Sequence, residues 1–148
     1  MKIGVIKPGE EPHLTEIHAG GGSYLAEYQR LVGGLIEYFE PLFGDNPALI
    51  VNEGFLANGS APNRAIYANE RLHDMGYLDQ MTYTHVPEVG ELYGLIFGTF
   101  LAVSHDADGN PRDMPADEWE KVLGTFAGRE SIESCTREIM RILEDSER

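Results

Sequence analysis

Short apolar runs, separated by glycine and proline, fill most of the first two thirds of the chain. Residues 1–7 are rich in β-branched side chains and end at Pro8-Gly9, which predicts a strand. A second strand over 13–18 would follow a polar turn and form a hairpin with the first. Further strands are predicted over 35–39 and 48–52, and one long, central strand over 93–103.

The sequence also predicts four helices. In the first, over 24–32, five apolar residues fall on one face, Ser23 can cap the start, and Gly33-Gly34 ends the helix. A short helix is expected after Pro62, over 63–72. The last two are expected over 115–126, with Asp113 as its cap, and over 130–144.

Strands followed by a helical end predict an α+β fold. We expect a single domain over 1–148, with a mixed, mostly antiparallel β-sheet. Its helices would pack on one face of the sheet, and residues 105–148 would form a helical C-terminal tail. The order of the strands in the sheet stays open.

Charge changes this picture most. The chain has 25 acidic and 11 basic residues, a net charge of −14. Residues 72–111 contain no Lys or Arg, but they contain six acids: Asp74, Asp79, Glu88, Glu91, Asp106 and Asp108. Such a surface repels phosphate backbones, so direct binding of nucleic acid is disfavoured. It either keeps the protein in solution or docks on a partner protein with a basic surface.

Location and cofactors are constrained by what the sequence lacks. The longest apolar run, Leu95–Val103, is far shorter than the ~20 residues of a membrane span. The N-terminus has no secretion leader, so we expect a cytoplasmic protein that does not bind membranes. The single cysteine, Cys135, rules out an internal disulfide. The histidine spacings and the turn that begins at Asp106 match no metal motif, and no cofactor is expected.

The first candidate ligand site is the turn of Gly20, Gly21, Gly22 and Ser23, which leads into a helix. Glycine-rich turns before a helix can bind anions through free backbone N–H groups. The Lys-Ser/Thr pair of a phosphate loop is missing here, because Ser23 and Tyr24 follow the glycines. A capped connection between strand and helix remains the alternative.

The second candidate is Asn63 with Arg64. Arginine is scarce in this chain, and its planar guanidinium binds anionic or planar ligands well. Arg64 could instead fix a loop by an internal ion pair, with Glu53 as a candidate partner. Both interpretations stay open at this point.

The elements Val32–Glu37, Asn52–Gly54, Pro62–Ala65 and Gly94–Phe100, with the opening Lys2–Glu16, resemble domain-of-unknown-function family 3846. The resemblance covers about residues 1–104. Residues 73–92 look like an insertion, the Gly20–Gly22 turn is unusual for the family, and the tail after Asp113 follows the family loosely. The family is found in phages and plasmids. The resemblance therefore implies a small accessory protein of a phage or other mobile element in a bacterial host.

Three functional hypotheses follow. The first is a non-enzymatic phage or mobile-element accessory protein, acting in counter-defence by binding a basic host protein through its acidic surface. The second is a sponge that sequesters a nucleotide-like signal near Asn63 and Arg64. The third is an uncharacterised enzyme, although no catalytic constellation is visible. A homodimer through the last helix is possible, because Ile139, Met140, Ile142 and Leu143 form a wide apolar stripe.

Overall fold

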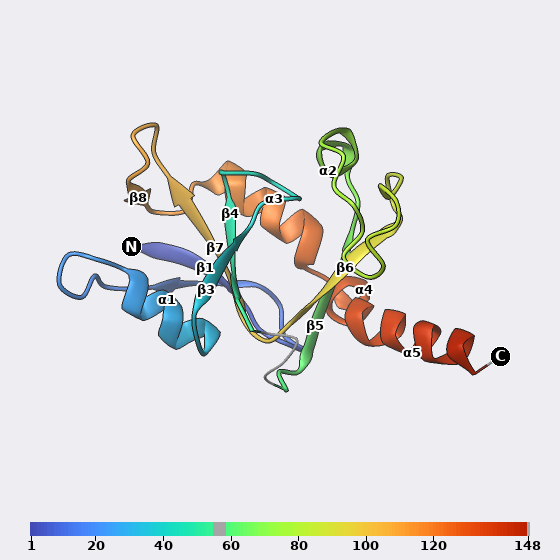
Figure 1. Ribbon diagram of the computed structural model, residues 1–148. Helices are drawn as coiled ribbons and strands as arrows, with labels where there is room; N and C mark the ends of the chain where they lie inside the picture. The colour runs from blue at the N-terminus through green and yellow to red at the C-terminus, as the bar shows by residue number, and fades with distance from the viewer. Residues whose placement is uncertain (55–58, 148) are drawn as a thin grey trace.

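The computed structural model describes residues 1–54 and 59–147 (Figure 1). Its larger sheet has the strand order β2-β1-β7-β4-β3, and every pairing in it is antiparallel. A short strand, β8, pairs with the end of β7. The strands of this sheet are β1 (Lys2–Ile6), β2 (His13–Glu16), β3 (Ile36–Phe39), β4 (Ala48–Asn52), β7 (Phe100–His105) and β8 (Pro111–Arg112). The predicted hairpin of β1 and β2 and the strands at β3 and β4 are confirmed.

The central strands of this sheet are buried on both faces. In β7, Leu101 and Val103 belong to one apolar cluster, and Phe100 and Ala102 belong to the other. Successive side chains of a strand point to opposite faces, so an uninterrupted apolar strand needs cover on both sides. The sheet therefore has two cores rather than one.

Helices α1 (Leu25–Val32) and α3 (Ala116–Phe126) provide that cover on opposite faces. Tyr28 and Val32 of α1 pack in one core, and Val122 and Phe126 of α3 pack in the other. The prediction of a single α+β domain is confirmed. The expectation that the helices pack on one face is wrong, because the central strands β1, β4 and β7 have no polar face to turn toward water.

A second, smaller sheet consists of β5 (Pro62–Tyr67) and β6 (Leu92–Phe97). Figure 1 shows it beside the larger sheet, with α5 extending outward from β5. We call β5, β6 and the three helices around them the β5–β6 unit. Those helices are α2 (Glu70–Asp74), α4 (Arg129–Ile132) and α5 (Ser134–Ser146).

Two predictions fail in the β5–β6 unit. The single strand expected over 93–103 is two strands, β6 and β7, in different sheets. They separate at Gly98, whose φ of +77° is the left-handed conformation that glycine adopts without strain. Most of the helix expected over 63–72 is strand β5, and only the short helix α2 remains. Asn69 begins α2, because its side chain accepts a hydrogen bond from the Leu72 amide.

The C-terminal helices are close to expectation in extent but differ at their starts. Asp113 does not cap α3, because its carboxylate accepts a hydrogen bond from the Lys2 amide at 2.8 Å. The last predicted helix is divided into α4 and α5. Residues 55–58, which fall in the connection between β4 and β5, lie outside the described residues. Within the described ranges, no helix is long and apolar enough to cross a membrane.

Candidate functional site

The most distinctive concave surface lies where α1 leaves part of one face of the larger sheet uncovered. Helix α1 has eight residues and shields only part of this face. Two adjoining hollows, of about 420 and 410 Å³, share Tyr38 of β3 and His105 of β7. We call them together the tyrosine–histidine groove, lined chiefly by Tyr24, Tyr28, Tyr38, His105, Glu40 and Asp45.

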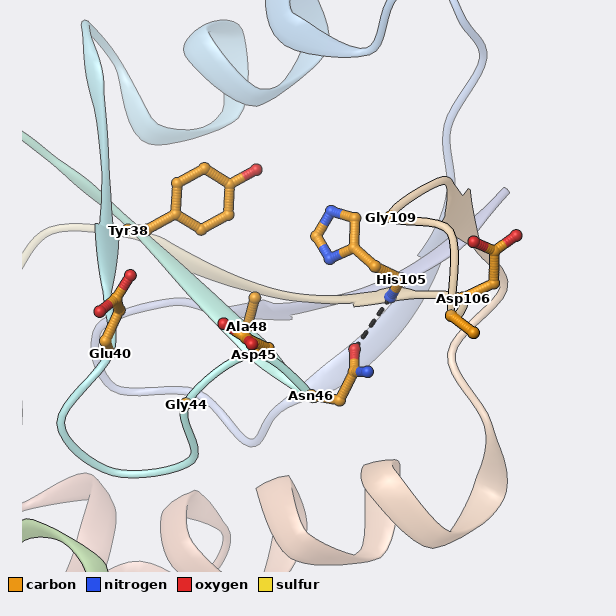
Figure 2. A pocket seen from close by; sticks show the side chains of 10 residues that line it. Tyr38, Glu40, Gly44, Asp45, Asn46, Ala48, His105, Asp106 and Gly109 are labelled. Atoms are coloured by element: carbon orange, nitrogen blue, oxygen red, sulfur yellow. Dashed lines mark hydrogen bonds between the residues drawn. The ribbon is translucent and has the colours of Figure 1, made fainter.

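Figure 2 shows the Tyr38 ring directed toward the His105 ring across the first hollow. The two ring centroids are 6.4 Å apart and the planes are tilted by 51°. Asn46 fixes the main chain at His105, because its side-chain oxygen accepts a hydrogen bond from the His105 amide at 3.0 Å. The aromatic walls are thus positioned by two strands, β3 and β7, that both pair with β4.

The loop 40–46 forms the lower wall of this hollow and is fastened from the β5–β6 unit. The guanidinium of Arg71 donates to the carbonyl oxygens of Glu40 and Pro41 at 2.8 and 3.0 Å. Asn69 donates to the Leu42 carbonyl at 2.8 Å. These bonds engage only main-chain oxygens of the loop. The carboxyl groups of Glu40 and Asp45 therefore remain on the surface of the groove.

The Tyr28 hydroxyl is buried beside the second hollow without a hydrogen-bond partner in the described part of the chain. Burial, with the nearby Tyr38 and Tyr24, raises the pKa of Tyr28 to about 12. Buried hydroxyl groups in proteins are nearly always paired, since an unmade hydrogen bond costs about 1–3 kcal/mol. Tyr28 lines the second hollow, while its hydroxyl oxygen is covered by the protein.

The acids Glu40, Asp45 and Asp106 line the first hollow, and among the described residues no Lys or Arg lines either hollow. The Asp106 carboxylate accepts hydrogen bonds from the Asn110 and Asp108 amides, which lower its pKa. Glu40 and Asp45 thus supply negative charge next to the face of an aromatic ring. Aromatic faces and carboxylates both attract cations, so the groove is suited to an ammonium or guanidinium group.

The predicted glycine turn reaches the edge of this groove. Gly22 and Ser23 line the second hollow. The turn closes on itself, because the Gly20 amide donates to the Ser23 carbonyl at 2.9 Å and the Ser23 amide donates back at 3.2 Å. Gly21 and Gly22 have positive φ angles that favour glycine. Ser23 is not the cap predicted for α1, because Tyr24 is the N-cap residue; the Ser23 hydroxyl accepts a hydrogen bond from the Leu25 amide instead.

Asn63 and Arg64 do not form a ligand site, which corrects the second prediction. Both side chains are fully buried, with an exposed fraction of 0%. Arg64 donates to the carbonyl oxygens of Phe126 and Glu10 at 3.0 and 2.6 Å, and to the Asn63 side chain at 2.8 Å. Its interactions are internal, as the alternative held, but the acceptors are carbonyl oxygens and not Glu53. Asn63 donates to two further carbonyl oxygens.

The predicted acidic surface is divided. Asp106 and Asp108 lie at the turn between β7 and β8, whereas Asp74, Glu88 and Glu91 lie around α2 and the loop before β6. Figure 1 shows these two places at opposite ends of the upper half of the molecule. The residues therefore do not make one continuous face.

Asp79 belongs to the interior rather than to the surface. Its carboxylate is 3% exposed and accepts hydrogen bonds from the amides of Thr82, Thr84 and His85 and from the Thr82 hydroxyl. Burial alone would raise the pKa of Asp79, but these four bonds outweigh it and lower the pKa. Asp79 thus shapes a loop and is not available to a partner.

The last helix, α5, is not wholly buried. Ile139 and Ile142 are half-buried, while Met140 and Leu143 are 54% and 52% exposed. The outer apolar residues leave a homodimer through this helix as a prediction.

Tyr38 and His105 were not identified as site residues from the sequence. They are 67 positions apart and approach each other only because β3 and β7 flank β4. Their side chains share a face because Tyr38 is paired with Ile50 and Ala48 with Val103, two residues before His105. Strand order, which no single residue pattern reveals, creates this part of the site.

The fold defines a single-domain α+β protein with an antiparallel sheet covered on both faces, and the groove is its most distinctive candidate site. The chain belongs to the family described as a domain of unknown function, DUF3846, whose model matches residues 1–127. The resemblance expected over 1–104 is therefore confirmed and extends to the end of α3. No curated protein and no solved structure matched the chain.

Proposed function

We propose that this protein is a non-enzymatic binding protein that engages a positively charged segment of another protein through the tyrosine–histidine groove. The observation that carries the proposal is the lining of the groove, where Tyr38 and His105 lie beside Glu40 and Asp45, and where the described lining residues include no Lys or Arg. A guanidinium or ammonium group would gain both the aromatic face and the carboxylates.

The charge of the whole chain supports the same partner. A net charge of −14 attracts basic surfaces over distances near the Debye length and repels phosphate-bearing ligands. A nucleotide-like ligand at Asn63 and Arg64 is not proposed, because both side chains are buried. In the groove, a phosphate group would meet Glu40 and Asp45.

The biological setting extends this proposal. The protein would be an accessory protein of a phage or other mobile element, acting in the bacterial cytoplasm. Its partner would be a host protein with a basic surface, and covering that surface would counter a host defence. Acidic proteins can block nucleic-acid-binding surfaces in this way, because those surfaces are rich in Lys and Arg.

The test is binding of a fluorescein-labelled peptide of alternating threonine and arginine, measured by fluorescence polarisation at 50 and 500 mM salt. A glutamate peptide of the same length is the control ligand. We expect binding of the arginine peptide alone, weakened about tenfold or more at the higher salt. Equal affinity for the glutamate peptide, or affinity that ignores salt, would overturn the proposal.

A matched pair of variants then separates the groove from net charge. Glu40→Gln/Asp45→Asn removes two negative charges from the groove. Asp117→Asn/Glu120→Gln removes the same number of negative charges from the exposed surface of α3. The first pair should weaken binding about fivefold or more, and the second should change it by less than about twofold. An equal loss of affinity in both double variants would show that the peptide responds to the total charge of the protein and does not bind specifically at the groove.

A further inference from the structure

The outer edge of β3 runs beside the tyrosine–histidine groove. β3 is the last strand of its sheet, and within the described residues it pairs only with β4. Tyr38 in this strand is 45% exposed, and Leu35, which immediately precedes the strand, is 64% exposed. An unpaired edge strand offers a row of backbone donors and acceptors to any extended segment that approaches it.

The register shows which backbone groups face outward. The Glu53 amide donates to the Leu35 carbonyl at 2.8 Å, so the main chain of Leu35 faces β4. Antiparallel strands alternate between residues that face the partner and residues that face away. Glu37 and Phe39 therefore also face β4, while the N–H and C=O groups of Ile36 and Tyr38 face outward.

Tyr38 thus has two roles at one place. Its backbone lies on the open edge, and its side chain forms a wall of the groove. Residues paired across two strands place their side chains on the same face of the sheet. An incoming residue paired with Tyr38 would direct its side chain into the groove.

We propose that an extended, basic segment of the partner adds to β3 as an antiparallel strand, with an arginine side chain that reaches across Tyr38 into the tyrosine–histidine groove. This inference rests on the proposed function and specifies how the same site recognises its ligand. Charge complementarity selects the occupant, because Glu37 and Glu40 flank the edge and Asp45 lies in the groove. Arginine suits the groove best, since its planar guanidinium stacks on aromatic rings and pairs with carboxylates.

The geometry predicts a periodicity in the partner. Side chains of a strand alternate between faces, so every second residue of the segment would face the groove. In antiparallel addition, the residues paired with Ile36 and Tyr38 both face the groove and donate their amides to β3. The residues between them point their amides toward water.

N-methylation of the peptide tests this pattern without altering the protein. In the alternating threonine–arginine peptide, the arginines would face the groove. N-methylating the two central arginines should weaken binding at least about tenfold, because it removes amide donors and adds bulk at the edge. N-methylating the two central threonines should change the affinity by less than about threefold, since those amides do not meet β3.

The outcomes distinguish the inference from the proposed function. Selective loss with N-methyl-arginine would support strand addition. Equal affinity of both methylated peptides and the parent, or an equal loss for both, would overturn strand addition and leave the groove as a site for a side chain alone. Failure of the parent arginine peptide to bind would overturn the proposed function and this inference together.

Discussion

The larger sheet and the β5–β6 unit are stabilised in different ways. The larger sheet has two apolar cores. Helix α1 covers one of them, and the other lies between the sheet, α3 and the β5–β6 unit, which contributes Ile66, Tyr93 and Ile96. The β5–β6 unit has only two strands, and its own apolar cluster is small, with Ala65, Leu95 and Cys135 at its centre. A two-stranded sheet is marginal by itself. The unit is therefore held to the larger sheet by the shared core and, in addition, by directed hydrogen bonds from buried polar side chains.

Arg64 and Asn63 provide most of these bonds. Arg64 joins β5 to the end of α3 and to Glu10 in the turn between β1 and β2. Asn63 joins β5 to Ile6 of β1 and to Gly98. The scarce arginine that looked like a ligand-binding residue in the sequence is a bridge between the two regions. The guanidinium of Arg64 could serve either role, and its complete burial makes it a bridge and not a ligand-binding group.

The largest effect on the free energy of unfolding is expected for Arg64→Ala. It leaves the carbonyl oxygens of Phe126 and Glu10 without their donor, removes a partner of Asn63 and opens a cavity. We expect a loss of about 3–5 kcal/mol in the free energy of unfolding, measured by urea denaturation. Arg71→Ala is the matched control, because Arg71 also binds two carbonyl oxygens but is half exposed. It should lose about 1 kcal/mol or less, and similar losses for both would contradict the bridging role.

An intermediate effect is expected when a methyl group is added to one glycine in each region. A Cβ on Gly4 would lie 2.5 Å from the ring of Trp119, and one on Gly94 would overlap the side chain of Gln80. Both Gly4→Ala and Gly94→Ala should lower the free energy of unfolding by about 1–3 kcal/mol, because the interior must shift to make room. Chemical denaturation measures both.

The single cysteine shows which region each glycine variant loosens. Burial raises the pKa of Cys135 to about 11, so the native thiol should react slowly with a thiol reagent at pH 8. When the two variants lose the same free energy of unfolding, Gly94→Ala should accelerate labelling of Cys135 more than Gly4→Ala does. The reason is that local opening of the β5–β6 unit exposes the thiol. Equal acceleration would mean that the two regions open only together.

The smallest effect on global stability is expected from titration of Asp79. The pKa of Asp79 is lower in the folded protein than its unfolded value of about 3.9, so the ionised carboxylate stabilises the folded loop at any pH above that unfolded value. This stabilisation is lost as the pH falls through the lower pKa of the folded state. NMR of the Thr82 and Thr84 amides should report loosening of the loop only at acidic pH. In Asp79→Asn the same amides should not show this acid transition, and an unchanged transition there would exclude Asp79 as its source.

The sequence predicts the larger sheet better than the β5–β6 unit, for a physical reason. The strands β1 and β4 and the helix α3 are specified by local apolar patterns and by the turns that end them. Residues 63–67 combine a buried arginine and asparagine with apolar residues, a pattern without a clean period of two. The strand conformation of β5 comes from its pairing with β6, 30 residues away, and from bonds that only the folded chain can offer.

The candidate site was predicted even less completely. The sequence did indicate acidity, the glycine turn that borders the groove and the strand that carries Tyr38. It could not indicate that Tyr38 meets His105, because that contact depends on the order of strands. Nor could it distinguish Asp79, which is buried, from Glu88 and Glu91, which are exposed.

The central position of β7 has a consequence for the way the protein is made. The hairpins β1–β2 and β3–β4 can form early, from neighbouring residues, but nothing joins them until β7 enters between β1 and β4. β7 ends at His105, so all residues up to His105 must leave the ribosome before the sheet can close. Pairing of β1 with β7 spans nearly a hundred residues, and such distant contacts slow folding. During synthesis the apolar side chains of the two hairpins therefore stay exposed to solvent until β7 has been synthesised and pairs with them.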